Sequence, residues 1–129
     1  MSEKQSSKPA MAISKLIEIV SKLRDPIDGC PWDLQQNHQS LIPYAIEEAH
    51  EVADAIQYGN DENLCDELGD LLLQVIIHAQ IASEEKRFCF EDVALAASMK
   101  MGERRVIAVG SGFQTKNSRS KAVSYTHLT

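Results

Sequence analysis

The sequence predicts an all-α protein whose helices pack as a bundle. Two observations indicate this class. Apolar residues recur at three- and four-residue steps over much of the first hundred positions, which is the period of an amphipathic helix. Only six glycines and four prolines interrupt the 129 residues, too few for an all-β chain rich in turns. A chain of this length suits one ordinary domain.

Two helices are expected in the first half of the chain. After nine polar residues, an apolar stripe predicts a helix over 10–24, which Pro26 and the following Asp-Gly pair end. The segment 25–39 holds two prolines and a glycine, so we expect no regular element there. Ser40 is the expected N-cap of a helix over 41–58, with Pro43 in its first turn.

The second half predicts a long helix followed by a short one. Asn60 or Asp61 caps a helix over 62–85, and residues 71–77 are apolar nearly all round, which places this helix at the centre of the bundle. A short stripe predicts a last helix over 91–101. From Val106 the amphipathic period is lost. We therefore expect the domain to occupy 1–105, with a disordered or expression-vector-derived tail at 106–129.

Charge and cysteine usage restrict the class of function. The net charge is -6, and residues 47–70 hold nine acids without a Lys or Arg, so a local attraction for cations is expected. A basic footprint for nucleic-acid polymers is absent. Three separated cysteines argue against a disulfide framework. No apolar run reaches about 20 residues, and the first ten residues lack a signal-peptide core, so we expect a cytoplasmic protein without a membrane span.

The acidic block places four carboxylates on facing helices. Residues three apart share a helix face, so Glu48 and Glu51 project together, as do Glu67 and Asp70. Glu48 falls four residues after Tyr44, within the inner stripe of its helix. A short turn at 59–61 makes the two helices antiparallel neighbours. The four carboxylates are then expected to face one another in a partly buried cleft.

Such a cluster needs a compensating positive charge, because like charges this close do not all stay ionised. Oxygen ligands suit Mg²⁺ or Mn²⁺, and Mg²⁺ commonly shares its coordination shell with substrate phosphates. A solvated acidic face is the competing interpretation, which the inward placement of both pairs disfavours. A di-iron site is a further alternative, because Glu47 and His50 mimic one of its ligand pairs, but the second pair is missing.

Three segments carry a resemblance to a known family. The runs LRDPIDGCPWDLQQNHQSL, YAIEEAHEVADAI and DELGDLLLQVIIHAQIA closely resemble the MazG-type nucleoside triphosphate pyrophosphohydrolases, members of the all-α NTP pyrophosphatase superfamily. The similarity covers about residues 10–88 and includes the pattern EExxE followed by ExxD.

The resemblance implies a reaction and a set of roles. A nucleoside triphosphate, in particular a deoxynucleoside triphosphate, reacts with water to give the monophosphate and pyrophosphate. The implied role is housekeeping of the nucleotide pool. Glu48, Glu51, Glu67 and Asp70 become ligands of Mg²⁺, for which Mn²⁺ can substitute, and Glu47 orients or deprotonates the attacking water. The resemblance also implies a homodimer or homotetramer, in which a four-helix-bundle-type domain is completed by oligomerisation. The alternative is a non-catalytic nucleotide-binding or regulatory module with the same acidic pocket.

Several further residues are candidates for substrate contact. Trp32 either stacks on a nucleobase or covers the end of the bundle. His38 either contacts the substrate or has a capping or surface role. His78 is expected to be a core or interface histidine. The cations expected to reach phosphates are Lys22, Arg24, Lys100 and Arg104.

Overall fold

The computed structural model describes residues 2–111, with the side chains of residues 7–103, and every regular element in this part of the chain is a helix. In order these are α1 (Ser2–Leu23), α2 (Pro31–Leu34), α3 (His38–Tyr58), α4 (Asp61–Glu84) and α5 (Phe90–Ser111). The all-α class is therefore confirmed. None of the described helices is both long and apolar enough to cross a membrane.

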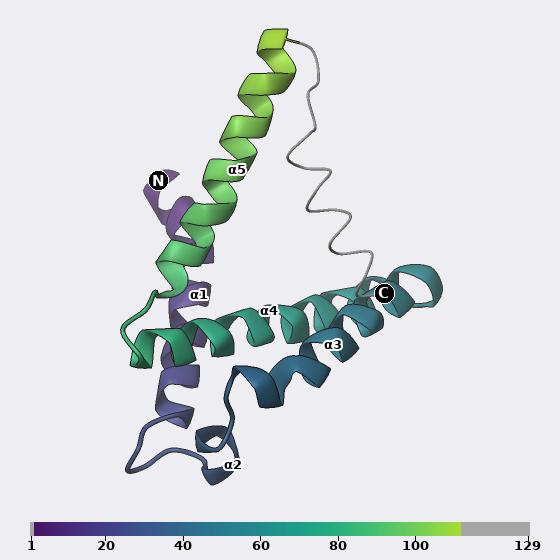
Figure 1. The fold of residues 1–129 in the computed structure, drawn as a ribbon. Helices are drawn as coiled ribbons and strands as arrows, with labels where there is room; N and C mark the ends of the chain where they lie inside the picture. Colours follow the sequence, from purple (N-terminus) through teal and green to yellow (C-terminus); the bar gives the residue numbers. More distant parts are fainter. Residues whose placement is uncertain (1, 112–129) are drawn as a thin grey trace. The chain divides into compact units, whose positions relative to one another are not determined.

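The chain divides into two units, residues 1–90 and residues 91–129. In the first unit, α3 runs back along α4 as an antiparallel hairpin, and α1 crosses the C-terminal half of α4 (Figure 1). Helix α4 therefore contacts both of its long neighbours, as its apolar middle predicts. In the second unit, α5 is a single continuous helix over the described residues.

The buried core of the first unit gathers on α4. Four of its side chains, Ile76, Ala79, Ile81 and Ala82, are at most 3% exposed. Val20 from α1 and Leu41 from α3 are each 1% exposed and pack into the same core. Burial of these apolar surfaces supplies the main favourable term that holds the three helices together.

Helix α1 begins earlier than expected. The periodicity predicts a start at residue 10, whereas the helix begins at Ser2 and includes Pro9. A polar segment without an apolar stripe gives no periodic signal, yet helix formation does not require one. The predicted end at residue 24 is confirmed within one residue, because α1 ends at Leu23.

The connection that follows α1 is a built turn rather than an irregular loop. The Asp25 carboxylate accepts hydrogen bonds from the backbone N–H groups of Ile27 and Asp28, at 2.8 and 2.9 Å. These bonds lower the pKa of Asp25. A Cβ at Gly29 would collide with the carbonyl oxygens of Leu23 and Asp25, so this close approach requires glycine. A single helical turn, α2, then begins at Pro31, where sequence analysis expects no element.

The expected N-cap of α3 is wrong by three residues. Helix α3 begins at His38, and its N-cap is Asn37 rather than Ser40. The Asn37 side chain accepts from the Ser40 N–H at 2.8 Å, and the Ser40 hydroxyl accepts from the Asn37 N–H at 2.9 Å. Ser40 is thus the third residue of a capping box. Pro43 consequently lies in the second turn of α3 instead of the first.

The ends of α4 agree with the sequence, and α5 is longer than expected. Helix α4 is capped by the Asn60 side chain, which accepts from the Asn63 N–H at 2.9 Å. Helix α5 continues to Ser111, ten residues past the predicted end and across the boundary we set at residue 105. The tail expected at 106–129 is helical up to residue 111, and its remainder, 112–129, lies outside the described residues.

Candidate metal centre

The α3–α4 hairpin brings three of the predicted carboxylates together. Glu48 projects from the middle of α3, and Glu67 and Asp70 project from the second and third turns of α4. One carboxylate oxygen of each lies within 4.8 Å of the others. The convergence follows from the register of the hairpin, because the short turn after α3 sets residue 48 level with residues 67 and 70. We call this set the carboxylate triad.

The triad is under electrostatic strain. Glu48 and Glu67 are half-buried and Asp70 is exposed. Burial raises the pKa of Glu48, and the charges of Asp70, Glu47 and Glu51 raise it further. Burial likewise raises the pKa of Glu67, with added repulsion from neighbouring acids. Among residues 7–90, no Lys or Arg forms an ion pair with the triad.

The donor set of the triad fits a hard divalent cation. Three carboxylates supply only oxygen ligands, which Mg²⁺ and Mn²⁺ prefer over softer donors. A bound cation would also place a positive charge beside these carboxylates, and so offset the burial and repulsion that raise the pKa of Glu48 and Glu67. The residues present therefore fit such an ion.

The other two predicted acids lie beside the triad rather than in it. Glu51 is half-buried and repels both Glu48 and Glu67, but it is outside the group of converging oxygens. Glu47 is exposed on α3 and adds to the repulsion felt by Glu48. Both are thus close enough to act on the triad electrostatically, and their roles as ligand and base stay predictions.

Arg24, a predicted phosphate contact, is occupied by protein partners. Its guanidinium forms a two-point ion pair with Glu84 of α4, at 2.8 and 2.9 Å. It also donates to the backbone carbonyls of Asp33 and Gln36, so it ties the end of α1 to α4 and to the segment around α2. Its side chain is only 9% exposed.

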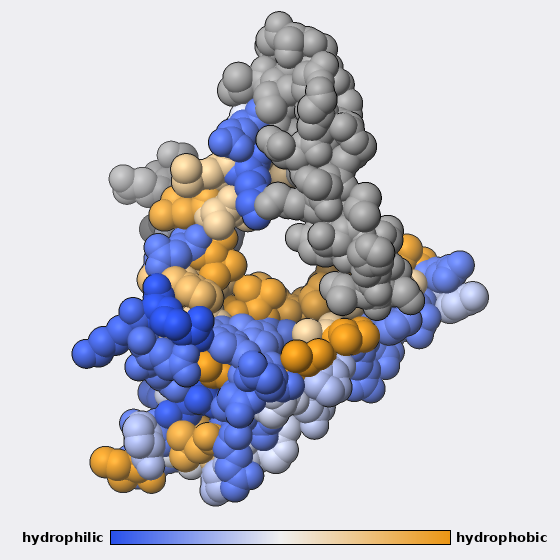
Figure 2. Space-filling view, viewed as in Figure 1, coloured by the Kyte–Doolittle hydropathy of each residue, from blue (hydrophilic) through white to orange (hydrophobic). Residues whose placement is uncertain are grey.

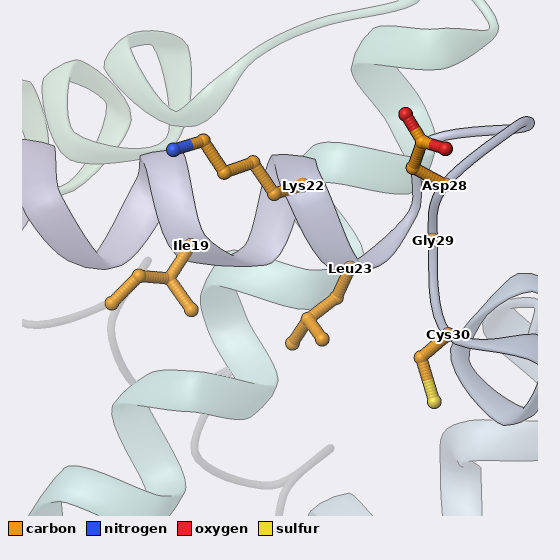
Figure 3. A pocket seen from close by; sticks show the side chains of 6 residues that line it. All are labelled: Ile19, Lys22, Leu23, Asp28, Gly29 and Cys30. Atoms are coloured by element: carbon orange, nitrogen blue, oxygen red, sulfur yellow. The ribbon is translucent and has the colours of Figure 1, made fainter.

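Lys22, another predicted phosphate contact, is exposed and pairs with Glu18 of its own helix at 3.7 Å. It lines a cavity of about 380 Å³ between the end of α1 and the turn that follows (Figure 3). Asp28 and Cys30 line the same cavity from the turn, while Ile19 lines it from α1. None of the predicted metal ligands lines this cavity.

The remaining predicted contacts are spread over both units. Trp32 is 49% exposed, and its ring meets that of Tyr44 edge to face with centroids 5.9 Å apart. Tyr44 lies one turn before Glu48, so this aromatic pair borders the triad along α3. Lys100 is exposed on α5 in the second unit. Arg104 also belongs to α5, but its side chain lies outside the described residues.

Two functional-site features were missed by the sequence interpretation. Tyr44 was placed in the inner stripe of its helix, whereas the structure leaves it 40% exposed against Trp32. His38 and His78 were treated separately, whereas their imidazoles are hydrogen-bonded to each other. The partners lie 12 and 40 residues apart, beyond the reach of any local sequence signal.

Known proteins similar to this chain belong to the family that the EExxE and ExxD motifs resemble. The MazG nucleotide pyrophosphohydrolase domain matches residues 36–106, which include all four predicted metal ligands. Two similar proteins are a nucleoside triphosphate pyrophosphohydrolase of Escherichia coli, 46% identical over 106 residues, and a nucleoside triphosphate pyrophosphohydrolase/pyrophosphatase MazG of Thermotoga maritima, 49% identical over 90 residues. These alignments cover 82% and 70% of this chain but 40% and 35% of the relatives.

A relative of lower identity also matches most of this chain with only a part of its own length. The nucleoside triphosphate pyrophosphohydrolase of Mycobacterium tuberculosis is 39% identical over 92 residues, covering 70% of this chain and 28% of that protein. The chain thus spans well under half the length of these relatives. The matched domain and the identities agree with the resemblance drawn from EExxE and ExxD. The chain belongs to the MazG nucleotide pyrophosphohydrolase family.

Proposed function

We propose that this chain is a Mg²⁺-dependent nucleoside triphosphate pyrophosphohydrolase. The observation that carries the proposal is the convergence of Glu48, Glu67 and Asp70 within 4.8 Å, on two helices of a domain whose family is named for this activity. Deoxynucleoside triphosphates are the proposed substrates, and removal of unwanted nucleotides from the pool is the proposed role.

The proposed reaction is hydrolysis at the α-phosphorus. A water oxygen bonds to that phosphorus while the bond to the bridging oxygen on the β-phosphate side breaks, and the products are the nucleoside monophosphate and pyrophosphate. The triad, with Glu51 beside it, would hold Mg²⁺ or Mn²⁺, and the ion supplies charge neutralisation for the phosphate oxygens. Exposed Glu47, next to Glu48 on α3, is the proposed group that orients the water and takes its proton.

The aromatic pair supports a place for the base of the nucleotide. The rings of Trp32 and Tyr44 are about half exposed and border the triad. Of the other predicted contacts, His38 has both ring nitrogens engaged by protein, so its ring face is what it offers to substrate. Lys22 remains available as a cation, and Arg24 is committed to Glu84. The roles of Lys100 and Arg104 as phosphate contacts stay proposals.

A non-catalytic nucleotide-binding module is the second candidate. Its support is that no Lys or Arg of residues 7–90 forms an ion pair with the triad, so no cation of the first unit is in place to hold a triphosphate for hydrolysis.

Three free cysteines agree with the proposed cytoplasmic location, and the acidic net charge agrees with the absence of a nucleic-acid polymer as partner.

A product assay separates the two candidates. Purified protein is incubated with a panel of deoxynucleoside triphosphates and Mg²⁺, and pyrophosphate is distinguished from orthophosphate. We expect pyrophosphate from the wild type, a large loss of rate for Glu48→Gln, and no loss for the control Glu62→Gln, an exposed acid of α4 outside the triad. Absence of turnover with every nucleotide favours the binding module, and orthophosphate as direct product places the attack at another phosphorus.

A further inference from the structure

Besides the carboxylate triad, a pair of histidines joins α3 to α4, about two turns of α4 beyond the triad. His38, the first residue of α3, and His78 of α4 have their Nδ1 atoms 2.7 Å apart. Their ring planes are within 5° of parallel, and the ring centroids are 5.0 Å apart. The centroid separation exceeds the nitrogen separation by about two ring radii. Both nitrogens therefore lie close to the line joining the centroids, and the rings meet edge to edge in a nearly linear hydrogen bond.

Such a contact holds only one proton between the two rings. If both Nδ1 atoms carried a proton, two N–H groups would collide, and if neither did, two lone pairs would face each other. Each imidazole is therefore restricted to one tautomer by its neighbour.

Arg87 decides which tautomer each ring adopts. Its Nη2 contacts Nε2 of His38, and because a guanidinium only donates, that nitrogen must accept and carries no proton. The proton of neutral His38 is then on Nδ1, which donates to Nδ1 of His78. His78 in turn carries its proton on Nε2. Hydrogen bonds thus run in one direction, from Arg87 through His38 to His78.

Arg87 is held in place independently of the histidines. Its backbone N–H donates to the Ala82 carbonyl at 3.0 Å, and its Nε donates to the Glu85 carboxylate at 2.7 Å. Its guanidinium also lies 5.5 Å from the Phe88 ring centroid. Lys86, with a φ of 60°, forms the left-handed turn that directs Arg87 back toward α3.

We propose that His38, His78 and Arg87 form a proton-sensitive latch that fastens the first turn of α3 to α4. An added proton has no compatible place in this chain. On Nε2 of His38 it would oppose the Arg87 guanidinium, and on Nδ1 of His78 it would oppose the Nδ1–H of His38. The latch is therefore closed when both histidines are neutral, and it opens when either becomes charged.

The charges around His78 favour the neutral state. Burial lowers the pKa of His78, and the neighbouring His38 lowers it further. Glu85 is the acid that pairs with Arg87, so its carboxylate is engaged next to the latch. Since the folded state binds the proton more weakly than the unfolded chain, the unfolded state gains protons first as the pH falls. The stability that the latch contributes is complete above the ordinary histidine pKa of 6.5 and is lost as the pH falls through the lower folded value.

Nitrogen NMR of the unmodified, isotope-labelled protein tests the latch directly. At pH 8 we expect the proton of His38 on Nδ1 and that of His78 on Nε2. On acidification His78 should titrate below the ordinary histidine pKa of 6.5. Protons on Nε2 of both His38 and His78, or titration of His78 at or above 6.5, would overturn the proposal.

Thermal unfolding between pH 8 and 5, in buffer with EDTA, tests the consequence. His78→Leu removes the titrating group, so its melting temperature should fall less on acidification than that of the wild type. Gln39→Ala, an exposed and non-titrating residue beside His38 on α3, is the control, and its profile should follow the wild type. Parallel profiles in all three proteins would overturn the proposal. If His78→Leu does not fold, the NMR assignment of the unmodified chain decides.

Discussion

Two cations at the end of α1 differ in what surrounds them. Arg24 is buried and bound by Glu84 and two backbone carbonyls, whereas Lys22 is exposed beside Glu18. A buried guanidinium that is removed leaves its carboxylate and carbonyl partners without a donor, while an exposed helix ion pair contributes little.

The first prediction compares these two residues. Arg24→Ala should lower the free energy of unfolding by about 2–4 kcal/mol, because Glu84 and both carbonyls lose their partner. Lys22→Ala should change it by less than about 0.5 kcal/mol. Urea denaturation followed by circular dichroism measures both values. Equal effects of the two substitutions would show that Arg24 does not hold α1 to α4.

A lower pH should weaken the ion pair between Arg24 and Glu84. Burial acts to raise the pKa of Glu84, but hydrogen bonds from Arg24 and Gln80 and the charge of Arg24 outweigh it and hold the pKa below the ordinary 4.5. The stabilisation is therefore present above pH 4.5 and is lost as the pH falls through the lower folded value.

The carboxylate triad gives a second prediction, for Glu67→Gln. Since burial and the repulsion of neighbouring acids raise the pKa of Glu67, its charge destabilises the metal-free fold, and this penalty grows as the pH rises above 4.5. The variant should therefore melt at a higher temperature than the wild type in EDTA at pH 7.5. With Mg²⁺ this difference in melting temperature should shrink or reverse, because the variant has lost a ligand of the ion.

Titration calorimetry with Mg²⁺ or Mn²⁺ and no nucleotide measures the loss directly. Removing a ligand should weaken binding by more than the roughly 10–100-fold typical of changes to residues behind the ligands. Exposed Glu62→Gln on the same helix is the control. Unchanged affinity in Glu67→Gln would remove this residue from the metal site, and detection of two irons per chain would favour the di-iron alternative.

At the scale of elements, the start of α3 depends on its capping box. Asn37 and Ser40 satisfy each other's backbone N–H, and the next residue after the cap, His38, belongs to the latch. The cap therefore sets where α3 begins and which side chain meets α4.

The third prediction concerns this cap. Asn37→Ala should lower the free energy of unfolding by about 1 kcal/mol, because the Ser40 N–H loses its acceptor. Exposed Gln39→Ala, in the same turn, should have a much smaller effect. Chemical denaturation measures both, and hydrogen exchange should show faster opening of the first turn of α3 in Asn37→Ala alone. Matching exchange rates in the two variants would contradict the role of the cap.

At the scale of the whole molecule, the described part leaves much apolar surface uncovered. Apolar side chains remain exposed on α1 and along the α3–α4 hairpin (Figure 2). On α3, Ile42 and Ile56 are 53% and 67% exposed, and on α4, Leu68 is 48% exposed. Surfaces of this kind on paired helices are typical of contacts between subunits.

The fourth prediction is that the protein is a homodimer or homotetramer in which a second chain covers these helices. Light scattering at micromolar concentration should give twice or four times the mass of 14.3 kDa. Dilution should lower the melting temperature, because unfolding is then coupled to dissociation. A monomer mass with a melting temperature independent of concentration would contradict the assembly.

Short-range features of the chain predict the helical class, three of the four helix ends around the α3–α4 hairpin, and the facing of Glu48 toward Glu67 and Asp70. These features follow from short-range rules: apolar period, cap residues and a short turn that forces antiparallel neighbours. The family follows from the same residues, because EExxE and ExxD are local patterns.

The packing of the helices sets which side chains distant in the sequence become partners. Arg24 meets Glu84 60 residues away, and His38 meets His78 40 residues away. Neither pair has a periodic or motif signal, because each depends on how whole helices cross. Glu51 is a further example. Its helical phase predicts that it projects with Glu48, whereas the packing of the hairpin sets its carboxylate beside the triad. Local physics fixes the direction of a side chain on its helix, and the packing of helices fixes what it touches.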